Sequence, residues 1–270
     1  ENIEIIIVDN ASTDNTILKI QKYKKNPCIK IFTNNKNLER SYSRNLGFIK
    51  STGKFVTLLD SDDILDKNIF KEFRNFYSKN KNHNIYFANF RILNLASKLY
   101  KTNILHKNIL NLETLSKGNY LSNICVFFKK SITKNITFDE NSKIIGIEDY
   151  DFNLRAVFLY GDAKKFSNNF LGTVIDHSTR SVNIDNIEKA EQRFIFFKNK
   201  IFYHKDFHKF NLLIKHRVLS TSSLYLALIC VKNKNKFKSL KYLYLSLIYN
   251  FKIITEKRFY YIIFKLFFTL

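Results

Sequence analysis

The sequence predicts an α/β fold with a mostly parallel sheet flanked by helices, followed by an all-helical C-terminal extension. Two observations support this prediction. Short apolar runs alternate with helix-like stretches along the first two thirds of the chain, which is typical of a sheet connected by crossover helices. From about Asn186 the pattern is helical only and rich in Lys, Phe, Tyr and Leu. We therefore expect an α/β domain over residues 1–185 and a basic, aromatic-rich helical extension over residues 186–270.

The first strand is expected at residues 3–8, because its apolar residues, continuous from 5 to 8, are typical of a strand buried on both faces of a parallel sheet. Asp14 then offers an N-cap for a helix that reaches about residue 25. The remaining strands are expected at 29–33, 54–59, 84–90, 123–128 and 170–175, and the remaining helices at 38–50, 67–78 and 148–160. The segment 91–117 shows no pattern that indicates a structure.

Composition and charge restrict the class of protein. With 45% hydrophobic and 16% aromatic residues, the 270-residue chain can bury a full core and is not disordered. Three widely spaced cysteines form no disulfide framework, so we expect a reducing, cytoplasmic location. The formal net charge of +22 predicts a polyanionic partner, such as nucleic acid, anionic lipid or a phosphorylated small molecule.

Acidic residues follow two strands that are expected to end at the same edge of the sheet. The first strand ends in Asp9, and the strand at 54–59 is followed by the run Asp-Ser-Asp-Asp at 60–63. Ligands bind beyond this edge in parallel α/β sheets. Neighbouring carboxylates repel each other unless a cation or hydrogen-bond donors compensate, and a hard divalent cation is the simplest answer. The alternative is that these residues only cap the helices that follow.

Five segments form an ordered set of motifs, namely EIIIVDNASTDNT at 4–16, SRNLG at 43–47, GKFVTLLDSDD at 53–63, GIEDYDFNLR at 146–155 and HSTRSV at 177–182. In this order they resemble the motifs of bacterial family-2 glycosyltransferases with the GT-A fold. The resemblance implies a nucleotide-binding half at about 1–90 and an acceptor half at about 91–185. The family's first strand has no counterpart, since residue 1 already lies in the second strand, and we expect the sheet to lack it.

The resemblance implies that the donor is a UDP-sugar. Asp9 would accept a hydrogen bond from the uracil imide, Arg44 would lie against the nucleotide, and Asp60 would hold the ribose hydroxyls. Asn10 and Arg180 are also assigned to donor binding. Asn10 stands where many members have a second Asp, a difference that concerns donor fit more than reaction type.

The resemblance also implies a metal. Asp62 would ligate Mg²⁺ or Mn²⁺, which neutralises charge on the leaving UDP. His177 would complete the metal shell, which favours Mn²⁺ slightly because imidazole is a softer ligand than carboxylate. The alternative for His177 is a strand-end histidine that bonds to the backbone.

Inversion at the anomeric carbon needs a carboxylate that takes the proton from the acceptor hydroxyl. We expect Asp149 to be this catalytic base, with Glu148 as its rival. The alternative is that both only cap the helix that follows. Asp151 is expected to be solvated.

These expectations describe an inverting, metal-dependent hexosyl- or N-acetylhexosaminyltransferase. Its acceptor would be a glycan or a lipid-linked glycan in the synthesis of bacterial lipopolysaccharide, capsule or another cell-surface glycoconjugate. One alternative is a catalytically inactive binding module of the same fold. A basic nucleic-acid-binding protein is less favoured, since no nucleic-acid motif is present and the strand-end acids would repel phosphate in the absence of metal.

The extension is expected to attach the protein to the inner face of the cytoplasmic membrane. Residues 201–270 hold 13 Lys or Arg but only two acids. The fourteen uncharged residues between Arg217 and Lys232 are too few to span a bilayer. Apolar residues at i, i+3 and i+4 spacing within 238–252 predict one apolar face for the headgroup region. The alternative is that this face packs on residues 186–230 or on a second subunit, and the oligomeric state stays open.

Overall fold

The computed structural model describes residues 3–103, 105–177 and 186–268. The chain forms two units. The first unit comprises Glu1–Leu110, Leu121–Ser142 and Ile147–Asp176, and the second comprises Asn111–Tyr120, Lys143–Gly146 and His177–Leu270. Two short segments from the middle of the sequence thus belong to the second unit. The domain boundary expected after residue 185 stays a prediction.

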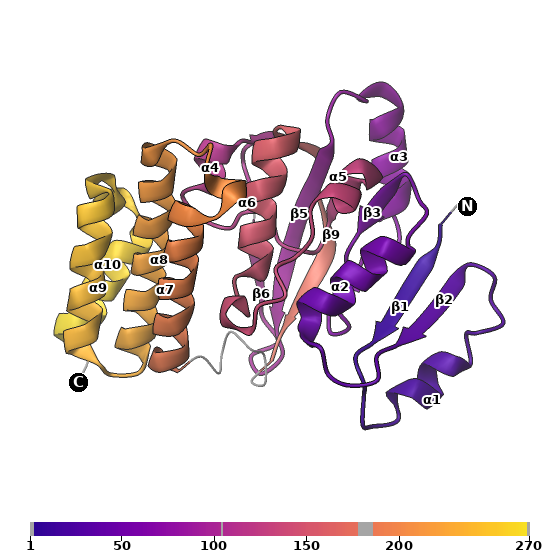
Figure 1. Cartoon of the computed structure of the whole chain (residues 1–270), viewed down its shortest axis with the longest axis horizontal. Coiled ribbons are helices and arrows are strands. Elements are labelled where there is room, and N and C mark those ends of the chain that lie inside the picture. Colours follow the sequence, from indigo (N-terminus) through magenta and orange to yellow (C-terminus); the bar gives the residue numbers. More distant parts are fainter. Residues whose placement is uncertain (1–2, 104, 178–185, 269–270) are drawn as a thin grey trace. The chain divides into compact units, whose positions relative to one another are not determined.

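The first unit opens with a parallel strand pair. β1 (Ile5–Asp9) and β2 (Ile29–Thr33) are joined by α1 (Thr16–Gln21), and their registers match residue by residue from Ile5 with Ile29 to Asp9 with Thr33 (Figure 1). Both strands confirm the sequence prediction. The helix ends at Gln21, before the expected end near residue 25. β1 ends at Asp9, so the polar residues that follow it lie at the edge of this pair.

A second sheet of seven strands forms the centre of the first unit. Its strands are β3 (Phe55–Thr57), β4 (Ile64–Leu65), β5 (Ile85–Asn94), β6 (Tyr100–Asn103), β7 (Ile109–Leu110), β8 (Val126–Lys129) and β9 (Ala163–Asp176). The order is β3-β8-β5-β9-β4, with β6 beside β5 and β7 beside β9. β5 and β9 are parallel, and the other pairs in this sheet are antiparallel.

The α/β class with flanking helices is confirmed, but the sheet is mixed and not mostly parallel. The difference comes partly from β4 and β8, which pair antiparallel with their neighbours, and partly from residues 91–117, for which the sequence showed no pattern. They contain the end of β5, then β6, β7 and α4 (Leu112–Leu115). β6 returns on β5 through a short turn in which Asn94 N donates to Leu99 O at 3.0 Å. Antiparallel pairing needs only such a turn, whereas parallel pairing needs a crossover of a dozen or more residues.

Two aromatic clusters hold helices of the first unit in place. Phe73 of α3 (Ile69–Lys79) stacks on Phe127 with ring centroids 4.1 Å apart, and Phe166 meets it edge-on at 5.3 Å. In the other cluster, Phe48 of α2 (Glu39–Lys50) packs beside Phe138 and Phe152, which stack on each other at 4.4 Å. Phe152 belongs to α6 (Glu148–Tyr160), so this second cluster fixes α2 against α6. The first unit also contains the short α5 (Lys130–Asn135).

The second unit is helical, as the sequence predicted for residues after Asn186. Its longer helices are α7 (Ile187–Tyr203), α8 (Leu212–Lys232), α9 (Lys236–Tyr249) and α10 (Lys257–Phe268), with 3-10 turns at Lys205–Phe207 and Phe251–Thr255. Asn186, Asn211 and Asn235 cap α7, α8 and α9, since each side chain accepts from the backbone N–H three residues later. Glu191 joins α7 to α9 by accepting from Lys238 Nζ at 2.7 Å and Tyr242 OH at 2.6 Å.

Within the part of the chain that the structure describes, α8 is the one helix long and apolar enough to cross a membrane by length and composition. It has 21 residues because it continues through Lys215 and Arg217, beyond the uncharged run counted in the sequence. An 18-residue apolar stretch of this helix is 61% buried inside the structure. Most of α8 is therefore packed inside the second unit.

Glu4 connects three segments of the first unit. Its carboxylate accepts from Lys30 Nζ at 2.9 Å, from Thr52 N at 2.5 Å and from Gly53 N at 2.7 Å. Burial favours the neutral acid, but these hydrogen bonds outweigh it and lower the pKa of Glu4 from 4.5 to about 2. The carboxylate therefore links the start of β1 to β2 and to the turn before β3.

We predict that Glu4→Gln destabilises the protein in a pH-dependent way. Because the pKa of the folded state lies below that of the unfolded chain, the contribution of Glu4 is fully present above about pH 4.5 and is lost as the pH falls towards 2. Urea unfolding at pH 7 and about pH 3 should show a smaller gap between wild type and variant at the lower pH. Glu188→Gln, which removes an exposed carboxylate of α7, is the matched control. A gap for Glu4→Gln that is equal at both pH values would contradict the prediction.

Candidate functional site

Arg44 of α2 holds two carboxylates that come from distant parts of the sequence. Its Nη1 donates to Glu148 Oε1 at 3.0 Å, and its Nη2 donates to both oxygens of Asp60 at 2.9 and 3.1 Å. Arg44 is 8% exposed and Glu148 is 2% exposed. The planar guanidinium has donors on two sides, which lets one side chain hold both acids. We call this arrangement the Arg44 clasp.

The charges around Arg44 offset the cost of burying it. Burial acts to lower the pKa of Arg44, but Asp60, Glu148 and Asp149 together raise it above its ordinary value. Asn123 adds to the clasp, since its side-chain oxygen, in the orientation that satisfies both partners, accepts from Nη2 at 2.9 Å and Nη1 at 3.2 Å. Arg44 is therefore a fixed cation between two elements of the first unit.

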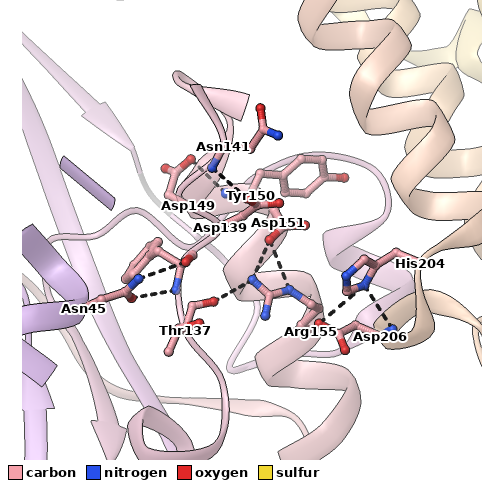
Figure 2. Close-up of polar contacts among 11 residues, drawn as sticks. Asn45, Thr137, Asp139, Asn141, Asp149, Tyr150, Asp151, Arg155, His204 and Asp206 are labelled. Carbon is pink, nitrogen blue, oxygen red and sulfur yellow. Dashed lines mark hydrogen bonds and ion pairs between the residues drawn. The ribbon is translucent and has the colours of Figure 1, made fainter. Parts of the chain in front are cut away.

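Asn45, the next residue of α2, fixes the segment beneath the clasp. Its Oδ1 accepts from Phe138 N at 2.8 Å and its Nδ2 donates to Phe138 O at 3.0 Å, the two dashed lines at Asn45 in Figure 2. Its Nδ2 also donates to Glu140 Oε1 at 2.7 Å. The Arg44 guanidinium lies 5.3 Å from the centroid of the Phe138 ring. This cation–π contact and the Asn45 bonds position α2, so that Arg44 points at its acidic partners.

Three aspartates converge after β3. Carboxylate oxygens of Asp60, Asp62 and Asp63 lie within 4.8 Å of one another. A turn in which Asp63 N donates to Asp60 O at 3.0 Å brings them together, and Asp63 Oδ1 accepts from Ile175 N of β9 at 3.1 Å. Asp62 is exposed. Hard oxygen donors in this arrangement suit Mg²⁺ or Mn²⁺, and such a cation would relieve their repulsion.

The residues after β1 form a hydrogen-bonded network with the loop before α2. Asp9 is 4% exposed, and its Oδ2 accepts from Ser12 N at 3.1 Å. Asn10 Oδ1 accepts from Asn34 Nδ2 at 2.9 Å and from Leu38 N at 3.0 Å. Asn10 Nδ2 donates to Asn37 Oδ1 at 2.7 Å, which an aspartate could not do. The network therefore explains why an amide occupies position 10.

Glu148 and Asp149 begin α6, as predicted, but they lie in different environments. Glu148 is buried in the Arg44 clasp, and Arg40 Nε lies 3.8 Å from its Oε1. Asp149 is half-buried, and its Oδ1 accepts from Tyr150 N at 2.8 Å (Figure 2). Of the two carboxylates, Asp149 is thus the more accessible.

The expectation that Asp151 is solvated is wrong. Asp151 is fully buried, and its Oδ2 accepts from Arg155 Nε at 3.0 Å, one helical turn along α6 (Figure 2). Arg155 Nη2 also donates to Thr137 O at 2.8 Å. The i, i+4 spacing of an acid and a base was the available signal, but it does not tell whether a pair is buried or exposed. Asp151 thus has a structural role in anchoring α6.

The two remaining predicted site residues are His177 and Arg180. His177 is half-buried, directly follows the end of β9 at Asp176, and is counted with the second unit. Arg180 lies outside the described residues. Their roles stay predictions. Conversely, sequence reasoning missed Asn45 and Asn123, although Asn45 stands beside Arg44 in the SRNLG motif.

The sequence is similar to parts of several known proteins. The chain is 32% identical over 154 residues to the minor teichoic acid biosynthesis protein GgaB of Bacillus subtilis, covering 53% of this chain and 16% of GgaB. It is 31% identical over 156 residues to an uncharacterized glycosyltransferase of Haemophilus influenzae, covering 57% of this chain and 60% of that protein. The matches therefore span less than two thirds of these relatives.

Solved structures share the fold. S. aureus TarS 1–349 in complex with UDP matches with a TM-score of 0.55 at 13% identity, covering 94% of this chain and 82% of that one. The same TarS fragment in complex with UDP-GlcNAc matches with a TM-score of 0.56 at 15% identity, covering 88% and 80%. The expected GT-A fold is thereby confirmed. A family model described as glycosyl transferase family 2 matches residues 1–137, which is half of the chain. By this match the chain belongs to glycosyl transferase family 2.

Proposed function

We propose that the protein is an inverting glycosyltransferase. It moves a sugar from a UDP-sugar to a glycan or lipid-linked glycan acceptor in the synthesis of a bacterial cell-surface polysaccharide or glycoconjugate. The observation that carries the proposal is the Arg44 clasp, because it joins the strand-end acids to the start of α6. The name of GgaB as a teichoic acid biosynthesis protein and the UDP and UDP-GlcNAc complexes of TarS support the substrate class.

On the donor side, Asp9 and Asn10 receive the base and Asp60 receives the ribose. The bond from Ser12 N to Asp9 Oδ2 holds the carboxylate so that its other oxygen can accept from the uracil imide. Asn10 shapes this edge through Asn37 and the backbone of Leu38. In this proposal Arg44 orients Asp60 through its two hydrogen bonds, and Arg180 adds a further contact to the donor.

The metal belongs beside Asp62. The convergence of Asp60, Asp62 and Asp63 supports this position, and His177 would supply a further ligand. Bound there, Mg²⁺ or Mn²⁺ would neutralise the charge that builds on the departing diphosphate. The chain's own contribution is to hold the carboxylates together through the turn at residues 60–63 and the bond from Ile175 N.

We assign the catalytic base to Asp149. The acceptor oxygen bonds to the anomeric carbon as the bond from that carbon to the diphosphate oxygen breaks, and the hydroxyl proton passes to the base. Asp149 is half-buried at the start of a helix, which is a rigid mount. Glu148 is occupied by Arg44, so we assign it the role of positioning α6.

We predict that Asp62→Ala removes metal-dependent donor binding and nearly all transfer. In the presence of Mn²⁺, a UDP-sugar should raise the melting temperature of the wild type, because a ligand that binds only the folded state stabilises it. The UDP-sugars to be compared are UDP-glucose, UDP-galactose and the corresponding UDP-N-acetylhexosamines. EDTA or Asp62→Ala should abolish the shift, while Asp162→Ala, another exposed aspartate of the first unit, should keep it. Full transfer in EDTA would rule out the metal role.

We predict that Asp149→Asn lowers kcat by roughly 10²–10⁴-fold and changes donor binding little, because it removes the base and keeps the shape. Glu148→Gln should instead lower the melting temperature, since it leaves the buried Arg44 with one carboxylate fewer. UDP release measured with acceptor checks the rates of both variants, and thermal unfolding checks the melting temperature of Glu148→Gln. If Glu148→Gln proves the crippling change and Asp149→Asn is mild, the assignment is reversed. Donor binding without turnover in the wild type would favour an inactive binding module.

A further inference from the structure

α9 has apolar residues on two faces. The inward residues Tyr242 and Leu243 are 6% and 7% exposed and pack inside the second unit. The outward residues are 46–81% exposed and comprise Phe237, Leu240, Tyr244 and Ile248 of α9 and Phe251 just beyond its end. Their spacings of three and four residues place them along one side of the helix. We call these five residues the outer face of α9.

The outer face of α9 is not needed for the packing of the second unit. From the sequence, the apolar residues of 238–252 could either pack in the core or contact a membrane. In the structure these residues fall into two groups, because Leu243 is buried whereas Tyr244 and Ile248 are 67% and 60% exposed. Within α9, Ser239 and Ser246 complete the inward side, and both are fully buried. The exposed aromatic residues therefore remain unexplained by the fold.

α10 repeats the arrangement. Phe259, Ile262 and Leu266 are buried, whereas four aromatic residues of the same helix are 46–70% exposed, namely Tyr260, Tyr261, Phe264 and Phe267. A helix with an apolar side turned to solvent is costly in water, since each exposed apolar side chain orders water that burial would release. Two successive elements thus present aromatic side chains outward.

Cations surround these exposed residues. From position 232 to 258 the exposed basic residues are Lys232, Lys234, Lys236, Lys241, Lys252, Lys257 and Arg258. Glu256 is the one acid in this part of the sequence. Aromatic rings with long basic side chains are the composition of a helix that lies in the headgroup region of a bilayer, where the rings enter the interface and the ammonium groups meet lipid phosphate.

We propose that the outer face of α9, together with the exposed side of α10, binds the surface of an anionic lipid bilayer. An anionic bilayer is the favoured partner because its negative charge complements the basic residues around the outer face of α9. A second copy of the chain would carry the same net charge of +22 and would bring like charges together around the face. The helices lie along the surface, since the outer face covers only one side of α9. The benefit of this position, proximity to a lipid-linked acceptor, rests on the proposed function.

The test is co-sedimentation of the full chain with phosphatidylcholine vesicles that do or do not contain phosphatidylglycerol, at low and high salt. The wild type should bind the anionic vesicles and should dissociate as salt is added. The triple variant Lys236→Gln, Lys241→Gln, Lys252→Gln should bind them roughly 100-fold more weakly. The triple variant Phe237→Ser, Tyr244→Ser, Ile248→Ser should lose at least roughly tenfold by removing the apolar contribution.

Matched controls come from exposed residues of the first unit. Lys19→Gln, Lys71→Gln, Lys81→Gln removes the same charge, and Leu18→Ser, Leu99→Ser, Leu159→Ser removes three apolar side chains that are 69%, 70% and 50% exposed. Both controls should bind as the wild type does. All altered side chains are exposed, so the variants should keep the wild-type melting temperature, and a variant that does not is replaced by its single substitutions.

Several outcomes would overturn the proposal. These are equal binding to neutral and anionic vesicles, no binding to either, and controls that lose as much as the α9 variants. Sedimentation equilibrium without lipid addresses a second copy. A wild-type dimer that Phe237→Ser, Tyr244→Ser, Ile248→Ser converts to monomer would make this face a subunit interface. Lipid binding is measured without substrate, so its loss leaves the UDP-sugar thermal shift unchanged and is distinguishable from a failure of the proposed function.

Discussion

The buried guanidinium of Arg44 is the constraint on which the first unit depends. It is held between Asp60, which follows the sheet strand β3, and Glu148, which begins α6. A buried cation is tolerated only with its partners, and removing one partner of such a pair costs roughly 3–5 kcal/mol. The clasp therefore couples the segment that carries the three aspartates at 60–63 to α6, the helix that carries the candidate base. Any movement that separated these two segments would have to expose or unpair Arg44.

The packing around the clasp supplies the rigidity that it needs. Phe48, Phe138 and Phe152 bring α2 and α6 into contact, and Asn45 pins the backbone of Phe138 on both its N–H and its carbonyl. Asp151 and Arg155 anchor α6 by a buried pair on the same helix. A catalytic group gains from such support, because a carboxylate held by a fixed helix start does not need to be oriented during the reaction. The half-buried Asp149 thus lies between Glu148 and Tyr150, which are both buried.

The second unit is held together by different interactions. Its helices are capped by asparagines and joined through Glu191, and α8 supplies much of its buried surface. Its exposed aromatic and basic side chains are in excess of what packing needs, which is the reason for assigning them a partner. The two units therefore divide the physical tasks: the first concentrates buried charge and the second carries exposed charge beside apolar rings.

The sequence by itself determined the local elements and the acidic run that enters the candidate site. The β-branched runs, the helix periodicity and the acidic run at 60–63 depend on neighbours along the chain, so β2, α2 and α6 were found at or near their true limits. Tertiary structure alone decided that β6 and β8 each pair antiparallel with β5, that Asp151 is buried and that Arg44 binds Glu148. These depend on residues as much as 104 positions apart, as for Arg44 and Glu148, and a local pattern carries no information about such partners. The division of α9 into a buried and an exposed apolar side has the same cause, because only the packed helices decide which side meets solvent.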